Sequence, residues 1–75
     1  MTHPTGMETV TPLGEFDLPW NKQVKIENVE FEGGVRLLRL RFKEGKRFTI
    51  VDVDHGNAAR IAEILNRWCD EEAPI

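Results

Sequence analysis

The sequence has few of the residues and segments that identify a protein's function most directly. It contains one cysteine, Cys69, so no disulfide can form within the chain, and a lone thiol is typical of a reducing compartment. It contains no serine, which excludes a serine nucleophile. Residues 1–4 lack the basic start of a signal peptide, and no segment approaches the roughly 20 apolar residues that span a bilayer. We therefore expect a cytoplasmic protein without a membrane partner.

The chain has 75 residues, which is enough for one hydrophobic core. A domain near this size buries only about 60% of the surface that its unfolded chain exposes, so its stability is low. Small domains often gain stability from disulfides, metals or partners, and a disulfide is excluded here. The length therefore favours an accessory subunit or a binding module over a complete enzyme.

Charge is unevenly distributed along the chain, although the net charge is only −3. Residues 34–48 carry a net charge of +5. The flanking segments are acidic, with −3 over residues 1–20, −1 over 21–33 and −4 over 49–75. A basic middle between acidic flanks is the main electrostatic feature of the sequence.

The composition of residues 1–17 predicts a flexible N-terminal arm. Threonine, proline, glycine and glutamate dominate this segment, and Leu13 and Phe16 are its expected docking points. We expect a single domain over residues 18–75, beginning at the Leu-Pro-Trp sequence that ends in Trp20. A tryptophan after a proline-fixed extended segment can pack on the edge of a core or anchor an interface, and the sequence leaves both roles open for Trp20.

Hydrophobic side chains with a period of two predict the first strand, which begins at Val24. Val24 and Ile26 share one face, whereas Val29 and Phe31 have the opposite parity. This change of parity predicts a bulge or twist near Asn28. A glycine pair at residues 33–34 then predicts a hairpin turn.

Two further strands are predicted after that turn. The second, over residues 35–43, places leucine and phenylalanine on one face and arginine and lysine on the other. A short turn around Gly45 leads to the third strand, over residues 47–53. That strand is apolar on both faces, which predicts that it lies in the middle of the sheet or partly under a partner.

A C-terminal helix is predicted from the capping residues Asp54 or Asn57 to about Glu71. Its apolar stripe consists of Ala58, Ile61, Ala62, Ile64, Leu65 and Trp68. The acidic residues 70–72 oppose the helix dipole, which suggests that they face a basic surface in a partner. The predicted fold is α+β: a three-stranded antiparallel sheet followed by one C-terminal helix (β-β-β-α).

The basic second strand has two interpretations. Arg39, Arg41 and Lys43 alternate onto one face, and we expect Arg47 on the next strand to join them. A sheet face of this kind can read the major groove of DNA. Alternatively, acidic residues of the first strand, Glu27 or Glu30, neutralise these cations across the sheet. The net acidic chain favours the pairing, or a basic patch that faces a protein, over DNA binding.

No catalytic, metal or cofactor site is predicted. The acidic residues from Asp52 to Glu63 resemble a calcium loop, but their glycine stands at the fifth position instead of the sixth. His55 has no nearby nucleophile, because Cys69 lies roughly 20 Å along the helix. We expect Cys69 to be buried as a small apolar side chain, as we do Trp68.

Several segments together resemble a known but uncharacterised family. Trp20-Asn21-Lys22 leads into a strand, and an arginine-rich strand and the sequence Phe48-Thr49-Ile50-Val51-Asp52-Val53-Asp54 precede an alanine-rich helix that closes on Trp68. This pattern resembles a family of short bacterial proteins with an LPW motif and an FTIxDxD strand, over residues 18–69. The resemblance implies no activity. In architecture alone, β-β-β-α is similar to the DNA-binding arms of some integrases and to plant transcription-factor domains.

The sequence therefore predicts a small non-catalytic binding or accessory protein that acts through an exposed sheet face or edge. Because the third strand is apolar on both faces, we expect a protein partner or self-association as a homodimer. DNA binding through the basic face of the sheet is the alternative. The predicted interaction surface consists of Trp20, Leu37, Arg39, Arg41, Lys43 and Arg47.

Overall fold

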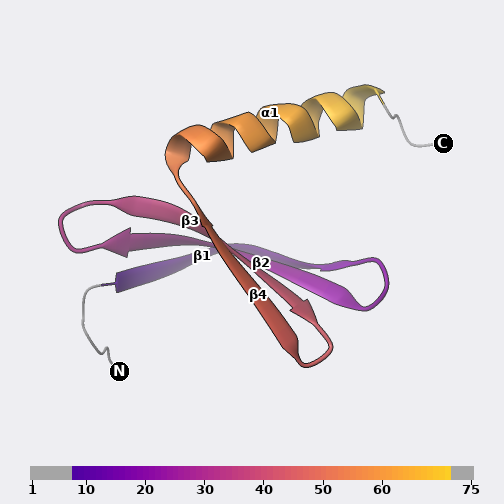
Figure 1. Ribbon diagram of the computed structural model, residues 1–75, viewed down its shortest axis with the longest axis horizontal. Helices are drawn as coiled ribbons and strands as arrows, with labels where there is room; N and C mark the ends of the chain where they lie inside the picture. Colours follow the sequence, from indigo (N-terminus) through magenta and orange to yellow (C-terminus); the bar gives the residue numbers. More distant parts are fainter. Residues whose placement is uncertain (1–7, 72–75) are drawn as a thin grey trace.

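A computed structural model describes residues 8–71, which form an antiparallel sheet and one helix (Figure 1). The elements are β1 (Glu8–Leu18), β2 (Lys22–Phe31), β3 (Arg36–Glu44), β4 (Arg47–Val53) and α1 (His55–Glu71). The sheet order is β1-β2-β3-β4, so that each strand pairs with its neighbour in sequence and β1 and β4 are the edges. The predicted α+β class, with a helix after an antiparallel sheet, is confirmed.

The prediction of three strands is wrong, because β1 adds a fourth strand in the segment expected to be an arm. Nearly all of β1 is exposed, so its sequence carries no pattern of one buried face. The strand is held by pairing with β2 along its length, and Pro12 is tolerated because β1 is an edge. β1 also crosses the boundary expected at Leu18. Residues 1–7 of the predicted arm lie outside the described residues.

The irregularity predicted near Asn28 is in β1 instead. The register of β1 shifts between Pro12 and Gly14, whereas β2 pairs with β3 without interruption. The change of parity in β2 therefore does not interrupt its pairing with β3. Instead, the apolar side chains of β2 are divided between the two faces of the sheet. Val24 is buried on one face and Val29, which is 0% exposed, on the other. This makes β2 the centre of a small core.

β4 is an edge strand and not a middle strand. Its sequence is apolar on both faces, but only Val53 is buried among its residues. Phe48 is 61% exposed and Ile50 is 50% exposed, on the same side of the strand. An apolar edge strand with this exposure is a surface that proteins usually cover.

The two glycine turns are confirmed. Gly33 and Gly34 have φ values of 98° and 89°, and Gly45, between β3 and β4, has a φ of 63°. The backbone N–H of Phe31 donates to the carbonyl of Val35 at 2.7 Å, which closes the β2–β3 turn. Glycine adopts positive φ without steric strain, so these turns set the hairpin registers with little loss of stability.

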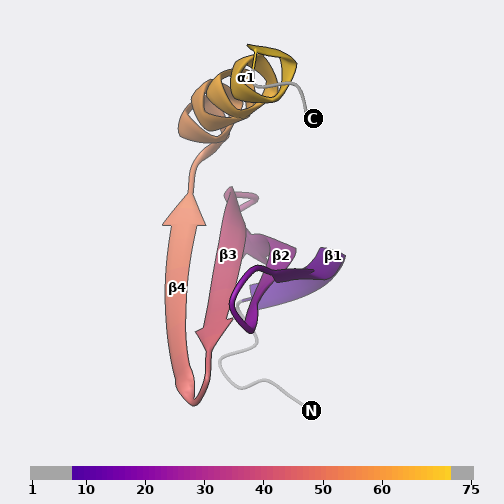
Figure 2. The same ribbon diagram turned by 90° about the vertical axis from the view of Figure 1, so that its right-hand side faces the viewer.

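The helix begins at a predicted capping residue, but its side chains are not buried as predicted. Asp54 is its cap: the Ala58 N–H donates to the Asp54 carbonyl at 2.8 Å, and the Asn57 side-chain amide donates to the Asp54 carboxylate at 2.7 Å. However, α1 continues past the end of the sheet instead of lying on a face (Figures 1 and 2). None of its described residues is buried. The expected burial of Trp68 and Cys69 is therefore wrong.

Candidate interaction surface

The strand registers divide the side chains of β2, β3 and β4 between two faces. Residues opposite each other in paired strands share a face. We call one side the apolar face, which consists of Val24, Ile26, Leu38, Leu40, Phe42, Val51 and Val53. We call the other side the charged face, which includes Lys25, Glu27, Leu37, Arg39, Arg41, Lys43, Phe48, Ile50 and Asp52.

Arg39 forms the best-defined ion pair on the charged face. Its Nε and Nη2 atoms donate to the two carboxylate oxygens of Asp52 at 2.9 and 3.1 Å. Its Nη1 atom lies 3.7 Å from a carboxylate oxygen of Glu8 on β1. The hydrogen bond from Arg39 lowers the pKa of Asp52, and the same bond raises the pKa of Arg39. Both partners therefore stay ionised at neutral pH.

Arg41 is paired with a buried carboxylate on β2. The Arg41 Nε atom donates to Glu27 at 2.9 Å, and the Lys25 ammonium lies 3.5 Å from the other Glu27 oxygen. Glu27 is only 4% exposed and needs these partners, because an unpaired charge at this depth would be costly. Of the two alternatives for the basic strand, the structure has cross-strand pairing at both Arg39 and Arg41. Glu27 was an expected partner, whereas Asp52 and Glu8 were not.

Of the four remaining predicted residues, Lys43 and Leu37 share the charged face with Arg39 and Arg41, whereas Arg47 and Trp20 do not. Lys43 is on the charged face, with its ammonium 5.9 Å from the centre of the Phe48 ring. Leu37 is half-buried on that face, opposite Val29. Arg47 pairs with Glu44 in the register and points to the opposite side, so the expectation that it joins the basic row is wrong.

Trp20 lies apart from all of these, in the turn between β1 and β2. It is 85% exposed, and both Trp20 and Asn21 have positive φ values, of 61° and 60°. Asparagine tolerates this conformation, but a bulky residue in it is a genuine outlier. The sequence left two roles open for Trp20, packing on the core and anchoring an interface. Packing on the core does not occur in this structure.

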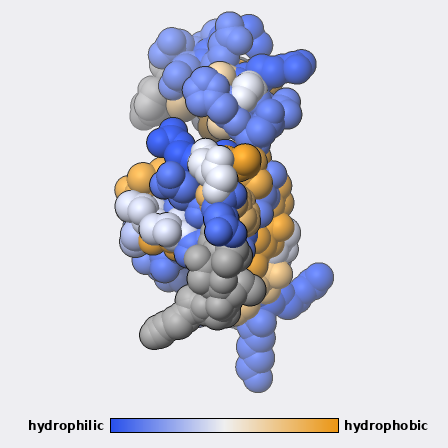
Figure 3. All heavy atoms as spheres, turned by 90° about the vertical axis from the view of Figure 1, so that its left-hand side faces the viewer, coloured by the Kyte–Doolittle hydropathy of each residue, from blue (hydrophilic) through white to orange (hydrophobic). Residues whose placement is uncertain are grey.

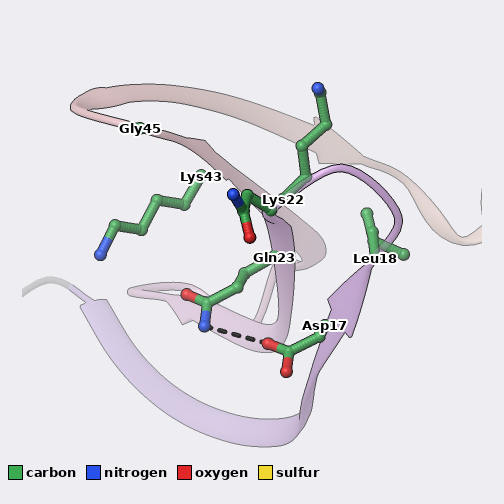
Figure 4. A pocket seen from close by; sticks show the side chains of 7 residues that line it. Asp17, Leu18, Lys22, Gln23, Lys43 and Gly45 are labelled. Atoms are coloured by element: carbon green, nitrogen blue, oxygen red, sulfur yellow. Dashed lines mark hydrogen bonds between the residues drawn. The ribbon is translucent and has the colours of Figure 1, made fainter.

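The turn region also forms a polar depression of about 420 Å³ (Figure 4). Its lining residues are Asp17, Leu18, Asn21, Lys22, Gln23, Lys43 and Gly45. The Gln23 amide donates to Asp17 at 3.1 Å, and the ammonium groups of Lys22 and Lys43 point apart in Figure 4. The depression therefore contains no converging set of acid, base and nucleophile.

An apolar groove of about 180 Å³ separates α1 from the apolar face. The sheet contributes Ile26, Leu38, Leu40 and Val53, and the helix contributes Ala58, Ile61, Ala62 and Leu65. Figure 3 shows hydrophobic residues gathered along one side of the sheet. Four of the six residues of the predicted helix stripe line this groove, whereas Ile64 and Trp68 do not. Periodicity predicts which residues share a helix face but carries no information on what covers that face.

Metal-ligating and nucleophilic side chains lie apart in the described residues. Across residues 8–71, no three His, Cys, Asp or Glu side chains are arranged to hold a metal ion. His55 and Cys69 are both exposed, and they are 14 positions apart on the helix, which corresponds to about 21 Å. In the described part of the chain, no helix is long and apolar enough to cross a membrane.

Comparison with known proteins assigns a family but no activity. No curated protein and no solved structure matches the chain. The resemblance to an uncharacterised family is confirmed, because residues 7–71 match the model of a family of unknown function. The chain belongs to this family, which is designated DUF6967.

Proposed function

We propose that this protein is a small non-catalytic binding protein that acts as a homodimer through α1 and the apolar face. The observation that carries the proposal is the exposure of large apolar side chains on the last two elements. On α1 these are Ile61, Ile64, Leu65 and Trp68, and on the apolar face of β4 it is Val51. Phe48 and Ile50 of β4 are also exposed but lie on the charged face. Monomeric soluble proteins rarely expose contiguous apolar patches of more than a few hundred Å².

The energetics of the chain support self-association. Among the described residues only three apolar side chains are buried, namely Val24, Val29 and Val53. Fully burying one large apolar side chain contributes about 1.5–3 kcal/mol, so covering the partly exposed stripe of α1 would add several kcal/mol to a fold with a small core. A second copy of the same chain provides a matching apolar surface without any other component.

DNA contact by the basic strand is the competing hypothesis, and the charged face argues against it. Arg39 and Arg41 already donate to Asp52 and Glu27, so contact with DNA would have to replace these bonds. Breaking the second pair would leave the Glu27 carboxylate buried beside only Lys25. The net charge of −3 also opposes approach to a polyanion.

Sedimentation equilibrium from low to high micromolar concentration tests the proposal. We expect a monomer–dimer equilibrium for the native chain and a shift to monomer for Leu65→Asp, because a charge in the stripe prevents its burial. Asn66→Asp is the matched control, since it adds the same charge to the next residue of α1 outside the stripe. A native chain that remains monomeric throughout would refute self-association. A mobility shift with duplex DNA at low salt would favour the competing hypothesis.

A further inference from the structure

The structure leaves two complementary surfaces in one chain without bringing them fully together. α1 exposes its apolar stripe along its whole length, and Phe42 and Val51 of the apolar face are also exposed. The groove joins only Ala58 to Leu65 of the helix to the sheet. Trp68 lies beyond that groove and is 61% exposed. Each of these exposed apolar surfaces could therefore be buried by contact with the other.

The connection between the two surfaces is too short for α1 to lie along its own sheet. Asp54 alone separates β4 from α1, whereas a strand-to-helix reversal typically uses a loop of about two to three residues. Asp54 is also fixed by its cap contacts with Ala58 and Asn57, and Val53 before it is buried. Short hinges of this kind favour exchange of an element between two copies.

The dimensions of the helix and the strand match. α1 has 17 residues, which correspond to about 25 Å, and β4 has 7 residues, which correspond to about 23 Å. A helix lying antiparallel to β4 would begin near Val53 and end near Arg47. In that position Trp68 would lie over the end of the strand, close to Phe42.

The distribution of charge also supports a helix that lies antiparallel to β4. Asp70 and Glu71 are at the C-terminal end of α1, which has no basic residue in its last turn, and the helix dipole disfavours them there. At the far end of β4, Lys46 and Arg47 are exposed, and neither forms an ion pair with another described residue. An antiparallel helix from a second copy would place the two acids beside these two cations.

From these observations we propose that two copies exchange α1, so that each helix lies antiparallel to β4 on the apolar face of the other copy. The inference rests on the proposed self-association and adds its geometry. A helix about 25 Å long and 10 Å wide covers roughly 250 Å² in projection. Each copy has one helix and one sheet face covered by the other copy, so exchange buries on the order of 500 Å² per copy. The projected area does not include the additional surface of protruding side chains. The buried area approaches the roughly 800 Å² per partner of a stable interface.

Paramagnetic broadening in a mixed dimer tests the exchange, because Cys69 is the only thiol for a spin label. A spin-labelled copy without ¹⁵N is mixed with a ¹⁵N-labelled Cys69→Ala copy. We expect broadening of the ¹⁵N amides of Gly45, Lys46 and Arg47, since the label on one helix would lie beside the β3–β4 turn of the other copy.

Four outcomes would overturn the exchange. Broadening at the N-terminus of α1 would indicate two helices paired side by side. Broadening at the β3–β4 turn only when spin label and ¹⁵N are in the same chain would indicate a helix folded onto its own sheet. A dimer without broadening at the turn would reject the exchange but leave self-association standing, whereas a monomer in sedimentation would reject both.

A charge reversal provides an independent readout. Arg47→Glu should weaken the dimer by about two- to five-fold, which is the range of an exposed ion pair. Asp70→Arg should weaken it similarly, and combining the two substitutions should restore the native affinity if the residues meet across the copies. Glu63→Arg is a control on α1 that should show no such rescue. Additive weakening in the double variant would contradict the proposed direction of the helix.

Discussion

The two halves of this molecule are built from similar residues but differ sharply in what they bury. β2 and β3 form the centre of the sheet, where Val29 is fully buried and Glu27 is buried with its two cationic partners. β4 and α1 have equally apolar sequences, yet of their residues only Val53 is buried. The comparison teaches that hydrophobic pattern sets which residues share a face, whereas burial depends on whether a neighbour exists to cover that face.

The largest expected effect compares two valines, one in each half. Val29→Ala should lower the free energy of unfolding by about 2 kcal/mol, because it removes buried methyl groups and leaves a cavity. Val51→Ala, at a site that is 43% exposed, should cost less than about 0.5 kcal/mol. Urea denaturation of dilute protein measures both. Equal losses would mean that β4 is covered in the monomer and that the two halves do not differ.

The next effect concerns the buried carboxylate. Arg41→Met should cost about 1–2 kcal/mol, because it leaves Lys25 as the one cation, among the described residues, that is paired with the buried Glu27 carboxylate. Lys43→Met changes the same residue class on the same face, and Lys43 forms no ion pair within the described chain. Its cost should stay below about 0.5 kcal/mol. If Lys43→Met proved as costly as Arg41→Met, the pairing of Glu27 would not explain the result.

Substitution of Trp20 tests whether this exposed turn residue contributes to the free energy of unfolding. Trp20→Gly should raise the free energy of unfolding by about 0.5–1 kcal/mol, because glycine adopts positive φ without the strain of a side chain. Asn21→Gly is the matched control, since Asn21 has nearly the same φ but asparagine tolerates it, and its gain should be smaller. Thermal unfolding of both variants decides this. A destabilised Trp20→Gly variant would show that the indole contributes to the fold.

The smallest effect is the pH dependence of the Arg39–Asp52 pair. Because folding lowers the pKa of Asp52 from 3.8, its contribution to stability is present above that value and is lost as the pH falls through the lowered pKa. Asp52→Asn should therefore flatten the loss of stability below about pH 4, by less than about 1 kcal/mol. Denaturation curves at several acidic pH values measure this. An unchanged acid limb in Asp52→Asn would contradict the assignment.

Sequence reasoning succeeded where one residue type fixes a local geometry. The glycine turns, a helix cap at Asp54 or Asn57 and the alternation of β3 were all predicted from such features. β1 was missed because an exposed edge strand is held by backbone pairing, which leaves no periodic pattern in its side chains. The partner of Arg39 was missed although the sequence held the signal for it. The predicted turn at Gly45 sets the β3–β4 register, and counting outward from the Glu44–Arg47 pair places Asp52 opposite Arg39.

The exposure of both tryptophans makes the protein's own fluorescence a reporter of assembly. Trp20 and Trp68 already contact water in the folded monomer, so unfolding should change their emission little. The exchanged dimer would bury Trp68 and leave the Trp20 turn in solvent. A blue shift on raising the concentration, retained in Trp20→Phe and lost in Trp68→Phe, would then follow association without any attached label.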